Sequence, residues 1–380
     1  MVLVTALLAG ICLAGSLYLL LAAGAVRRFA RASIPRAVAP IPVTILKPLH
    51  GEDAQLYENL HSFCTQHYPC FQVIFGVRDP ADPAIPIVRR LIAALPDCDI
   101  ALVVDPSVSG SNYKVSNLEN MIAVAKHDIF VIADSDMRVG PDYLTAVTAP
   151  LAEAKIGLVT CLYRGRPVAG LSSRLAAMFV NHGFLPSALI GERMRPGDAC
   201  FGATMALRRD IYATIGGFAA LRDQLADDYA LGAAIRRAGK RIVLSPQLVD
   251  TMMADPDLRA MIGHELRWAR TIRLIAPIGF AASVVTHPLA LSLIATLALG
   301  FPPAMLAVLA IVLACRLAMV RIIDRALDLP AANLWLVPIR DMLSFAVFIA
   351  SFLGNRVAWR DSTFRIAADG RLVAIGDDRA

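Results

Sequence analysis

The sequence predicts an α/β domain, with a mainly parallel sheet flanked by helices, joined at both of its ends to transmembrane α-helices. Three observations lead to this fold class. Hydrophobic residues make up 57% of the 380 residues, and they gather toward the two ends of the chain. Between these ends, strand-like and helix-like segments alternate along the sequence. Carboxylates directly follow several predicted strands, at the edge where α/β sheets bind ligands.

The composition excludes several classes of protein. Charged residues are 18% of the chain, compared with about 25% in soluble globular domains. This high apolar content excludes a disordered chain, and the 7 cysteines are too sparse for a disulfide-stapled domain and lack paired metal-ligand spacing. We attribute the formal charge of +6 to juxtamembrane arginines, so we expect no nucleic-acid partner. No G-x-G-x-x-G motif follows the first strand, which disfavours a nicotinamide enzyme.

The first predicted element is a transmembrane helix over residues 1–26, which contain no charged side chain. This length exceeds the roughly 20 residues that cross a bilayer. No Lys or Arg precedes the segment, whereas Arg27, Arg28 and Arg31 follow it, so the positive-inside rule places the next region in the cytoplasm. The same charge distribution disfavours the alternative of a cleaved signal peptide. Residues 27–42, with several prolines, are expected to form a juxtamembrane connector.

Residues 43–255 are expected to form the cytoplasmic catalytic domain. Short runs rich in β-branched and apolar residues predict strands over 43–46, 71–77, 100–104 and 129–133. Helical spacing of apolar residues predicts helices over 53–67, 86–95, 115–125 and 229–238. This alternation favours a mainly parallel sheet, because parallel neighbours require crossover connections that are usually helices.

Four aspartates follow the predicted strands: Asp79, Asp105, Asp134 and Asp136. The sequence Asp134-Ser135-Asp136 comes after a strongly apolar strand and offers two carboxylates for a hard divalent cation, Mg²⁺ or Mn²⁺. A role for these aspartates in a turn alone is the structural alternative.

A second acidic pair, Asp227-Asp228, opens the predicted helix over 229–238. Carboxylates at this position are favoured by the helix dipole, so one interpretation is a helix N-cap. The other interpretation is a general base that takes a proton from an acceptor hydroxyl group. The spacing alone leaves both interpretations open.

Residues 256–279 are expected to form an interfacial helical segment that carries His264, Arg267 and Trp268. A basic helix with a tryptophan at the level of the headgroups explains this composition structurally. A functional interpretation is a cationic lid over a leaving diphosphate, with an aromatic wall for the acceptor. Both interpretations hold together for an enzyme that acts on a lipid.

The last membrane segments are expected over residues 280–354, followed by a tail over 355–380. A helical hairpin is predicted over 280–300 and 303–320, with its turn at Phe301-Pro302-Pro303. The block 334–353 contains Arg340-Asp341, and each such charge at mid-bilayer costs about 2.5–3.5 kcal/mol. Either the adjacent pair compensates itself, or the two side chains face a protein cavity. Arginines in the tail argue for a cytoplasmic C-terminus, which requires that one segment is re-entrant or interfacial.

An ordered series of motifs resembles the D, D-x-D, (E/D)D, (Q/R)-x-x-R-W series of processive and lipid-directed family 2-like glycosyltransferases. Within this group, the segments 46–51, 79–85 and 114–118 resemble the ceramide glucosyltransferase family. The segments 160–165 and 264–268 look most like the bacterial hopanoid-biosynthesis glycosyltransferases. The series is Lys47-Pro48-Leu49, Val77-Arg78-Asp79, Asp134-Ser135-Asp136, Asp227-Asp228-Tyr229 and His264-Glu265-Leu266-Arg267-Trp268.

This resemblance implies a GT-A fold, a UDP-sugar donor, Mg²⁺ or Mn²⁺, and inversion at the anomeric carbon. It also implies roles for individual residues. His264 departs from the motif, because it occupies a position that is Gln or Arg in the family, and this leaves its role open. The implied roles are contact with the nucleoside for Asp79, proximity to the nucleotide for Lys47 and Lys114, and binding of the metal–diphosphate for Asp134 and Asp136, with Asp136 as the direct metal ligand. They also include general base for Asp228, and closure over the diphosphate and acceptor for Arg267 and Trp268.

The expected function is that of a multi-pass enzyme of the bacterial cytoplasmic membrane that glycosylates a lipid hydroxyl. The resemblance implies transfer of GlcNAc from UDP-GlcNAc to bacteriohopanetetrol, a hopanoid. The nearest alternative is glucosylation of ceramide from UDP-glucose. An alternative of another class is a non-catalytic membrane scaffold or a transporter, which the small number of apolar segments and the full set of acidic residues disfavour.

Overall fold

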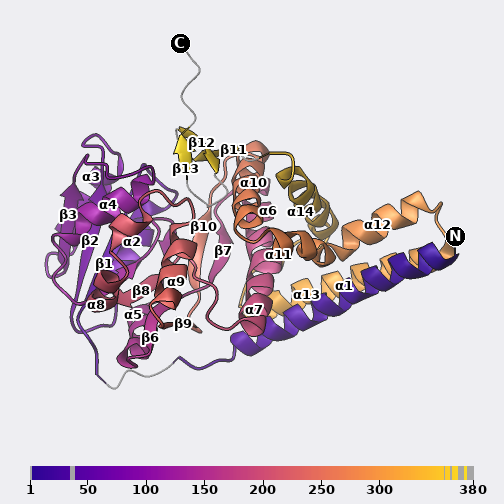
Figure 1. Cartoon of the computed structure of the whole chain (residues 1–380), viewed down its shortest axis with the longest axis horizontal. Coiled ribbons are helices and arrows are strands. Elements are labelled where there is room, and N and C mark those ends of the chain that lie inside the picture. Colours follow the sequence, from indigo (N-terminus) through magenta and orange to yellow (C-terminus); the bar gives the residue numbers. More distant parts are fainter. Residues whose placement is uncertain (1, 35–38, 355, 360–361, 367–371, 375–380) are drawn as a thin grey trace, which may run out of the picture.

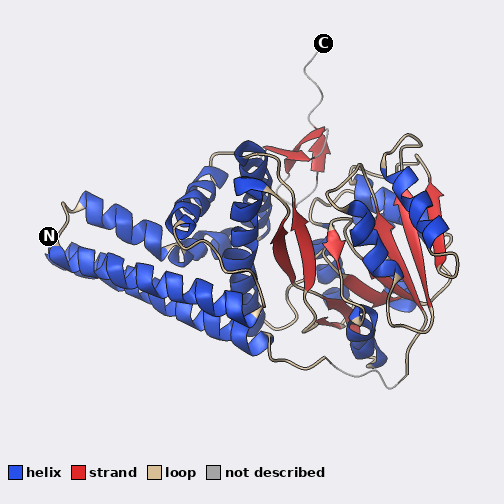
Figure 2. Ribbon diagram, turned by 180° about the vertical axis from the view of Figure 1, so that it is seen from behind, coloured by secondary structure: helices blue, strands red, loops and turns tan. Residues whose placement is uncertain are grey.

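The computed structural model describes residues 2–34, 39–354, 356–359, 362–366 and 372–374. Parts of the expected connector and of the expected tail lie outside these residues. The described chain forms a domain of strands and helices beside an all-helical region from which two long helices project (Figure 1). A small sheet lies between these two parts in Figure 2, where strands are red and helices blue.

The main sheet has seven strands in the order β3-β2-β1-β4-β8-β6-β9. Only β8 runs antiparallel to its neighbours β4 and β6, so the predicted mainly parallel sheet and its four predicted strands are confirmed. In the register, Leu46 lies opposite both Ile74 and Ile132, and the carboxyl ends of β1, β2 and β4 therefore meet at one edge. The strands are β1 (Val43–Pro48), β2 (Phe71–Val77), β3 (Asp99–Val104), β4 (Ile129–Ile132), β6 (Ile156–Thr160), β8 (Met205–Arg208) and β9 (Arg241–Leu244).

Helices cover both faces of this sheet and create two apolar cores. Successive residues of a strand point to opposite faces, so Ile45 and Phe75 belong to one core, whereas Leu46 and Ile74 belong to the other. The four predicted helices are present with slightly different ends. The helices of this domain are α2 (Leu56–Cys64), α3 (Ala84–Ala94), α4 (Tyr113–Ile122), α5 (Tyr143–Thr148), η1 (Ala149–Ala152), α8 (Arg209–Thr214), η3 (Phe218–Leu221) and α9 (Asp227–Arg237).

A second sheet of three short strands lies next to the main sheet. Its strands are β5 (Met137–Arg138), β10 (Val249–Met253) and β7 (Tyr163–Pro167), and β10 pairs antiparallel with β5 and parallel with β7. A continuous helical stretch follows β7 and consists of α6 (Gly170–Phe179), the π-helical turn η2 (Val180–Phe184) and α7 (Leu185–Met194). None of these elements was predicted from the sequence.

The side chain of Asn181, in the π-helical turn, makes two hydrogen bonds with the backbone of β7, as a neighbouring strand would. The amide of Asn181 accepts from the Gly165 N–H at 2.8 Å and donates to the Gly165 carbonyl at 2.9 Å. Asn181 is 5% exposed, so these two backbone groups have no access to water as a substitute partner. The close approach also requires a glycine, because a Cβ built at Gly165 would lie 2.8 Å from Ala177 Cα in α6.

Replacing Asn181 with alanine should therefore destabilise the protein. Both backbone groups of Gly165 would lose their partner, and an unsatisfied buried group costs about 1–3 kcal/mol. We expect a lower midpoint of thermal unfolding in detergent. Asn120→Ala is the matched control, because Asn120 of α4 also donates to two backbone carbonyls, those of Asp105 and Ser107, but in a more exposed position. Equal midpoints for the two variants would contradict this account of Asn181.

Two helices of the described chain are long and apolar enough to cross a membrane, α1 (Val2–Phe29) and α13 (Pro303–Ala326), and they lie side by side. The predicted helix over 280–300 is instead broken into α11 (Pro277–Ala282), η4 (Ser283–Thr286) and α12 (Pro288–Ala298), with a bend of 67°. The break precedes Pro288, which lacks the N–H that would continue the helix. The bent pair is a third span only if its two halves cross together.

The remaining helices are α10 (Leu258–Ile275) and α14 (Leu336–Ser351), which lie side by side. At 16 residues, α14 spans about 24 Å and is shorter than the roughly 30 Å hydrocarbon layer. The charges of Arg340 and Asp341 do not compensate each other, because each pairs with a different helix. Three strands follow α14 in an antiparallel sheet: β11 (Arg356–Trp359), β12 (Ser362–Ile366) and β13 (Leu372–Ala374).

Candidate active site

The carboxyl ends of β1 and β4 bring together a cluster of lysines and aspartates. Lys114, in the first turn of α4, has its Nζ 2.7 Å from Asp134 Oδ1 and 3.3 Å from Asp227 Oδ2. Lys47, near the end of β1, donates from Nζ to the backbone carbonyl of Asp134 at 2.6 Å. These contacts join the predicted D-x-D loop, the predicted acidic helix start and both predicted lysines at one edge of the sheet.

Lys47 is fully buried below this edge, and its Nζ lies 3.7 Å from the centre of the Phe63 ring. Burial lowers the pKa of Lys47 to about 7, although the carboxylates of Asp136 and Asp134 act in the opposite direction. Because its ammonium group bonds to the backbone rather than to a carboxylate, Lys47 fixes the course of the loop that carries both aspartates.

Lys114 has the opposite electrostatic balance. Burial alone would favour its neutral form, but the carboxylates of Asp134 and Asp227 outweigh burial and raise the pKa of Lys114 above its ordinary value. Lys114 therefore remains a cation at any physiological pH. Its position is set by Asn112, whose side chain caps α4 by accepting from the N–H groups of Lys114 and Val115.

Asp136 faces the second sheet, and its Oδ2 accepts from Thr251 Oγ1 of β10 at 2.7 Å. Burial and the neighbouring Asp134 raise the pKa of Asp136 to about 6. In the described part of the chain, no three His, Cys, Asp or Glu side chains gather into a complete metal site. Two neighbouring carboxylates nevertheless supply the hard oxygen donors that Mg²⁺ and Mn²⁺ prefer, provided that a substrate supplies the other ligands.

Asp228 lies at the start of α9 and faces the same space as Asp134. Its Oδ2 accepts from the Gly202 N–H at 3.0 Å, and its Oδ1 accepts from the Tyr229 N–H at 2.7 Å. A Cβ built on Gly202 would lie 3.5 Å from Oδ2 of both Asp134 and Asp228, so this residue keeps the space between the carboxylates open. Burial and the adjacent Asp227 raise the pKa of Asp228 to about 6. A carboxylate with this pKa can exchange a proton near neutral pH.

The helix α10 presents the residues of the predicted R-W motif. The indole of Trp268 stacks on Phe179 of α6 with 6.1 Å between ring centres, and the His264 ring lies 4.3 Å from it. His264 Nδ1 is 3.6 Å from Asp255 Oδ1, so a carboxylate of this chain lies next to the imidazole ring. The charges of Arg267 and Asp228 both act on the phenol of Tyr163 in β7, in opposite directions on its pKa.

Tyr163 is a site residue that was not expected from the sequence. Burial and the carboxylate of Asp228 raise the pKa of its phenol, whereas Arg267 partly opposes them. Its ring stacks on Phe184 at 4.9 Å, and Phe184 packs edge-on against Phe201 at 5.8 Å, next to Gly202. Aromatic rings therefore lead from the helical region to the carboxylates. Tyr163 lies in segment 160–165, whose resemblance to a known family gave no role to this residue, and the pairing of β7 with the distant β10 brings it to the site.

The other predicted carboxylates, Asp79 and Asp105, lie farther along the sheet edge, and each accepts from its own loop. A small cleft adjoins Lys114 of the lysine–aspartate cluster, and Arg78, which follows β2, lies there over the Tyr113 ring at 4.0 Å. Asp82 is buried and structural, because it accepts from the Gly51 and Ala84 N–H groups. The cleft is lined by Pro48, Leu49, His50, Arg78, Tyr113, Lys114 and Asn117.

Known proteins similar to this chain include glycosyltransferases. The sequence model of glycosyl transferase family 21 matches residues 7–372. Ceramide glucosyltransferase 1 of Caenorhabditis elegans is 23% identical over an alignment of 346 residues, which covers 87% of this chain and 72% of that protein. A ceramide glucosyltransferase of Candida albicans is 37% identical over an alignment of 107 residues, which covers 25% of this chain and 20% of that protein.

The fold also matches solved structures. The mannosyltransferase PcManGT of Pyrobaculum calidifontis, solved in complex with GDP-Man and Mn²⁺, has a TM-score of 0.54 and 21% sequence identity. The match covers 91% of this chain and 98% of that chain. This likeness confirms the predicted GT-A type of fold.

Proposed function

Since the chain belongs to glycosyl transferase family 21, we propose that it transfers a sugar from a UDP-sugar to the hydroxyl group of a membrane lipid, with inversion at the anomeric carbon. The observation that carries this proposal is the convergence of Asp134 and Asp228 on the space beside Gly202, with Lys114 between the two acidic segments. In this proposal, the partly buried carboxylate of Asp228 lies close to the site for the donor diphosphate. A glycosyltransferase is an enzyme, so family membership also disfavours the non-catalytic scaffold or transporter.

The proposed reaction needs one base and no covalent nucleophile. The acceptor oxygen attacks the anomeric carbon, the bond from that carbon to the diphosphate oxygen breaks, and Asp228 takes the proton of the attacking hydroxyl. UDP leaves with the electron pair of the broken bond. Lys114 and Arg267 are the cations placed to stabilise the charge that develops on the diphosphate.

Asp136 and Asp134 fit a divalent cation by the chemistry of their oxygen atoms. Bound there, Mg²⁺ or Mn²⁺ would neutralise charge on the donor diphosphate. Asp136 is the proposed direct ligand, because one oxygen of Asp134 already contacts Lys114. The side chain of Lys47 holds the loop that carries both aspartates, through its hydrogen bond to the Asp134 carbonyl. We propose that the nucleoside of the donor binds at the part of the main-sheet edge that lies near Asp79.

The acceptor is proposed to reach Asp228 from the helical region along the aromatic residues. The similarity to ceramide glucosyltransferases favours UDP-glucose as donor and a ceramide-like lipid as acceptor. A second candidate is transfer of GlcNAc to bacteriohopanetetrol, which the resemblance of segments 160–165 and 264–268 favours. We propose that α1 and α13 anchor the chain in a bacterial cytoplasmic membrane, with the domain over 43–255 in the cytoplasm and the segment 256–279 at the interface.

An assay of the purified full chain tests this proposal. UDP-glucose and UDP-GlcNAc are each offered with ceramide and with bacteriohopanetetrol in detergent, and the lipid product is identified by mass spectrometry. We expect a glycosylated lipid together with release of UDP. Formation of glucosylceramide alone would favour the first acceptor, and formation of glycosylated hopanoid alone would favour the second. Absence of a lipid product in all four combinations would contradict both assignments.

The rate of transfer should depend on the protonation of Asp228. The base acts only as a carboxylate, and its pKa is raised to about 6 by burial and by Asp227. The rate should therefore rise with pH through about 6 and level off above it, because the fraction of Asp228 that is ionised increases. Measurement of kcat between pH 5 and 8 at saturating substrates checks this expectation. A rate that falls as the pH rises through this range would contradict Asp228 as the base.

A further inference from the structure

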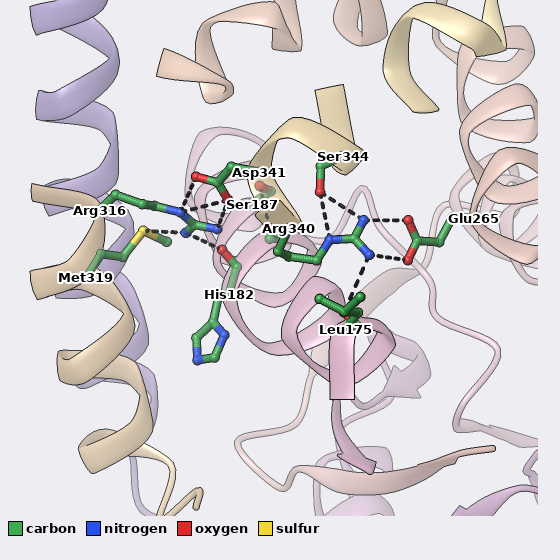
Figure 3. Close-up of polar contacts among 10 residues, drawn as sticks. Leu175, His182, Ser187, Glu265, Arg316, Met319, Arg340, Asp341 and Ser344 are labelled. Atoms are coloured by element: carbon green, nitrogen blue, oxygen red, sulfur yellow. Dashed lines mark hydrogen bonds and ion pairs between the residues drawn. The ribbon is translucent and has the colours of Figure 1, made fainter. Parts of the chain in front are cut away.

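Arg340, in the second turn of α14, is the largest fully buried side chain in the described part of the chain, with 1% of its surface exposed. Figure 3 shows its guanidinium group surrounded by acceptors from three helices. Within α14 itself, Nε and Nη2 donate to Ser344 Oγ at 3.1 and 3.0 Å. A buried arginine near a membrane is expensive, so its partners indicate what it does.

The main partner of Arg340 is Glu265 of α10. Nη1 donates to Glu265 Oε1 at 2.8 Å, and Nη2 donates to Glu265 Oε2 at 2.6 Å. This bidentate contact fixes both the distance and the relative rotation of the two side chains. Glu265 precedes Trp268 by three positions in the same helix, so the two side chains project from neighbouring parts of the α10 surface.

A second route also leads from Arg340 to Trp268. The Arg340 guanidinium carbon lies 5.3 Å from the centre of the Phe179 ring in α6, and Phe179 stacks on Trp268. Nη1 also contacts the Leu175 carbonyl of α6 at 3.5 Å. Arg340 therefore constrains Trp268 from two directions, through the backbone of α10 and through the Phe179 ring.

We propose that Arg340 is a positioning residue for sugar transfer, which acts through Glu265 and Phe179 to hold Arg267 and Trp268 of α10 at the active site. This inference rests on the proposed function of those two residues. The inference explains why α14 is short and carries a buried charge. In this account, α14 sets the position of α10 against α6, and the position of α10 sets the shape of the site where the acceptor binds.

Stability alone is a poor explanation of this pair. Replacing a buried ion pair by apolar residues of similar volume is often neutral or stabilising, whereas removing one partner costs about 3–5 kcal/mol. An ion pair does, however, fix a single register between two helices, which apolar side chains do less strictly. A displacement of about 1 Å at a catalytic group can reduce a rate by about 100-fold.

The neighbouring residue provides a matched control. Asp341 pairs with Arg316 of α13 on another side of α14, with Arg316 Nη2 2.8 Å from Asp341 Oδ1. Arg316 also donates to the His182 carbonyl at 2.7 Å. Figure 3 shows the contacts of Arg316 apart from those of Arg340, and none of the described contacts of Arg316 and Asp341 is with Glu265 or Phe179. Apolar replacement of this pair perturbs the same helix without altering the link to α10.

The experiment compares two double variants of the full chain: Arg340→Met with Glu265→Leu, and Arg316→Met with Asp341→Leu. For the first, we expect a fall in kcat of about 10- to 100-fold with little change in KM for the UDP-sugar. For the second, we expect kcat close to that of the wild type. Thermal unfolding midpoints of both show whether lost turnover follows lost stability. If the first double variant does not fold, Arg340→Lys, which keeps the charge but not the bidentate geometry, should show a partial loss of kcat.

A second readout is independent of the reaction. The chain has 3 tryptophans, so Trp335→Phe with Trp359→Phe leaves Trp268 as the only indole. Its emission spectrum should shift when the Arg340–Glu265 pair is replaced and should not shift in the Arg316–Asp341 variant. Wild-type kcat in the first double variant, or equal losses in both, would overturn the inference. A wild-type chain that transfers no sugar would instead contradict the proposed function, and the Trp268 emission would still test the positioning of α10.

Discussion

Replacing Asp228 with asparagine should nearly abolish sugar transfer while leaving binding of the UDP-sugar largely intact. The amide oxygen of asparagine can still accept from the Gly202 N–H or the Tyr229 N–H, which are the two contacts that Asp228 makes at the start of α9. It cannot take a proton from the acceptor. A general base contributes about 100- to 10,000-fold to a rate, and we expect kcat to fall within this range. Lipid product formation measures the rate, and calorimetry measures donor binding.

Asp210→Asn is the control for this variant. Asp210 also lies in the first turn of a helix, α8, but its side chain is 71% exposed and remote from the lysine–aspartate cluster. It should transfer sugar at the wild-type rate. Near-normal turnover by Asp228→Asn would remove Asp228 from the role of base and leave it as a residue that fixes the end of α9.

The first half of the sheet could be predicted because its information is local. The strands β1 to β4 are runs of apolar residues separated by helices that the same local spacing reveals, and parallel pairing then follows from the crossovers. The strands β5, β7 and β10 contain only two to five residues. Their pairing joins segments that are far apart in the sequence, such as Tyr163 with Val249. Short strands with distant partners leave no pattern that a local reading of the sequence detects.

The same distinction applies to the site. Asp134 and Asp136 were predicted to lie at the sheet edge because they follow a strand. For Asp228, the start of a helix left a helix N-cap and a general base equally open, and only the resemblance favoured the base. Tyr163 and the open space beside Gly202 depend on contacts between distant segments. For Arg340, the sequence revealed a charge that required compensation, but the partner could be any acidic residue of the chain. The choice of Glu265 depends on how α10 and α14 pack, which composition does not determine.

Removing divalent cations should stop the reaction. The donor diphosphate carries negative charge that enters a space already lined by Asp134, Asp136 and Asp228. Lys114 offsets part of this charge, but it is shared between Asp134 and Asp227. We therefore expect activity to disappear in EDTA and to return with Mg²⁺ or Mn²⁺, as measured by lipid product formation.

The two aspartates should differ in this respect. Asp136→Asn removes a charge from the proposed direct ligand, so Mn²⁺ bound in the presence of UDP, measured by electron paramagnetic resonance, should fall more than in Asp134→Asn. Asp134→Asn instead weakens the partner that lies closest to Lys114, at 2.7 Å. The freed ammonium group can then contact the diphosphate directly. We therefore expect the loss of UDP binding in Asp134→Asn to be smaller than the loss of metal binding in Asp136→Asn. Full activity in EDTA would exclude a metal role for both residues. Lys114 and Arg267 would then have to neutralise the leaving group alone, and Lys114→Met would become the variant with the larger loss of kcat.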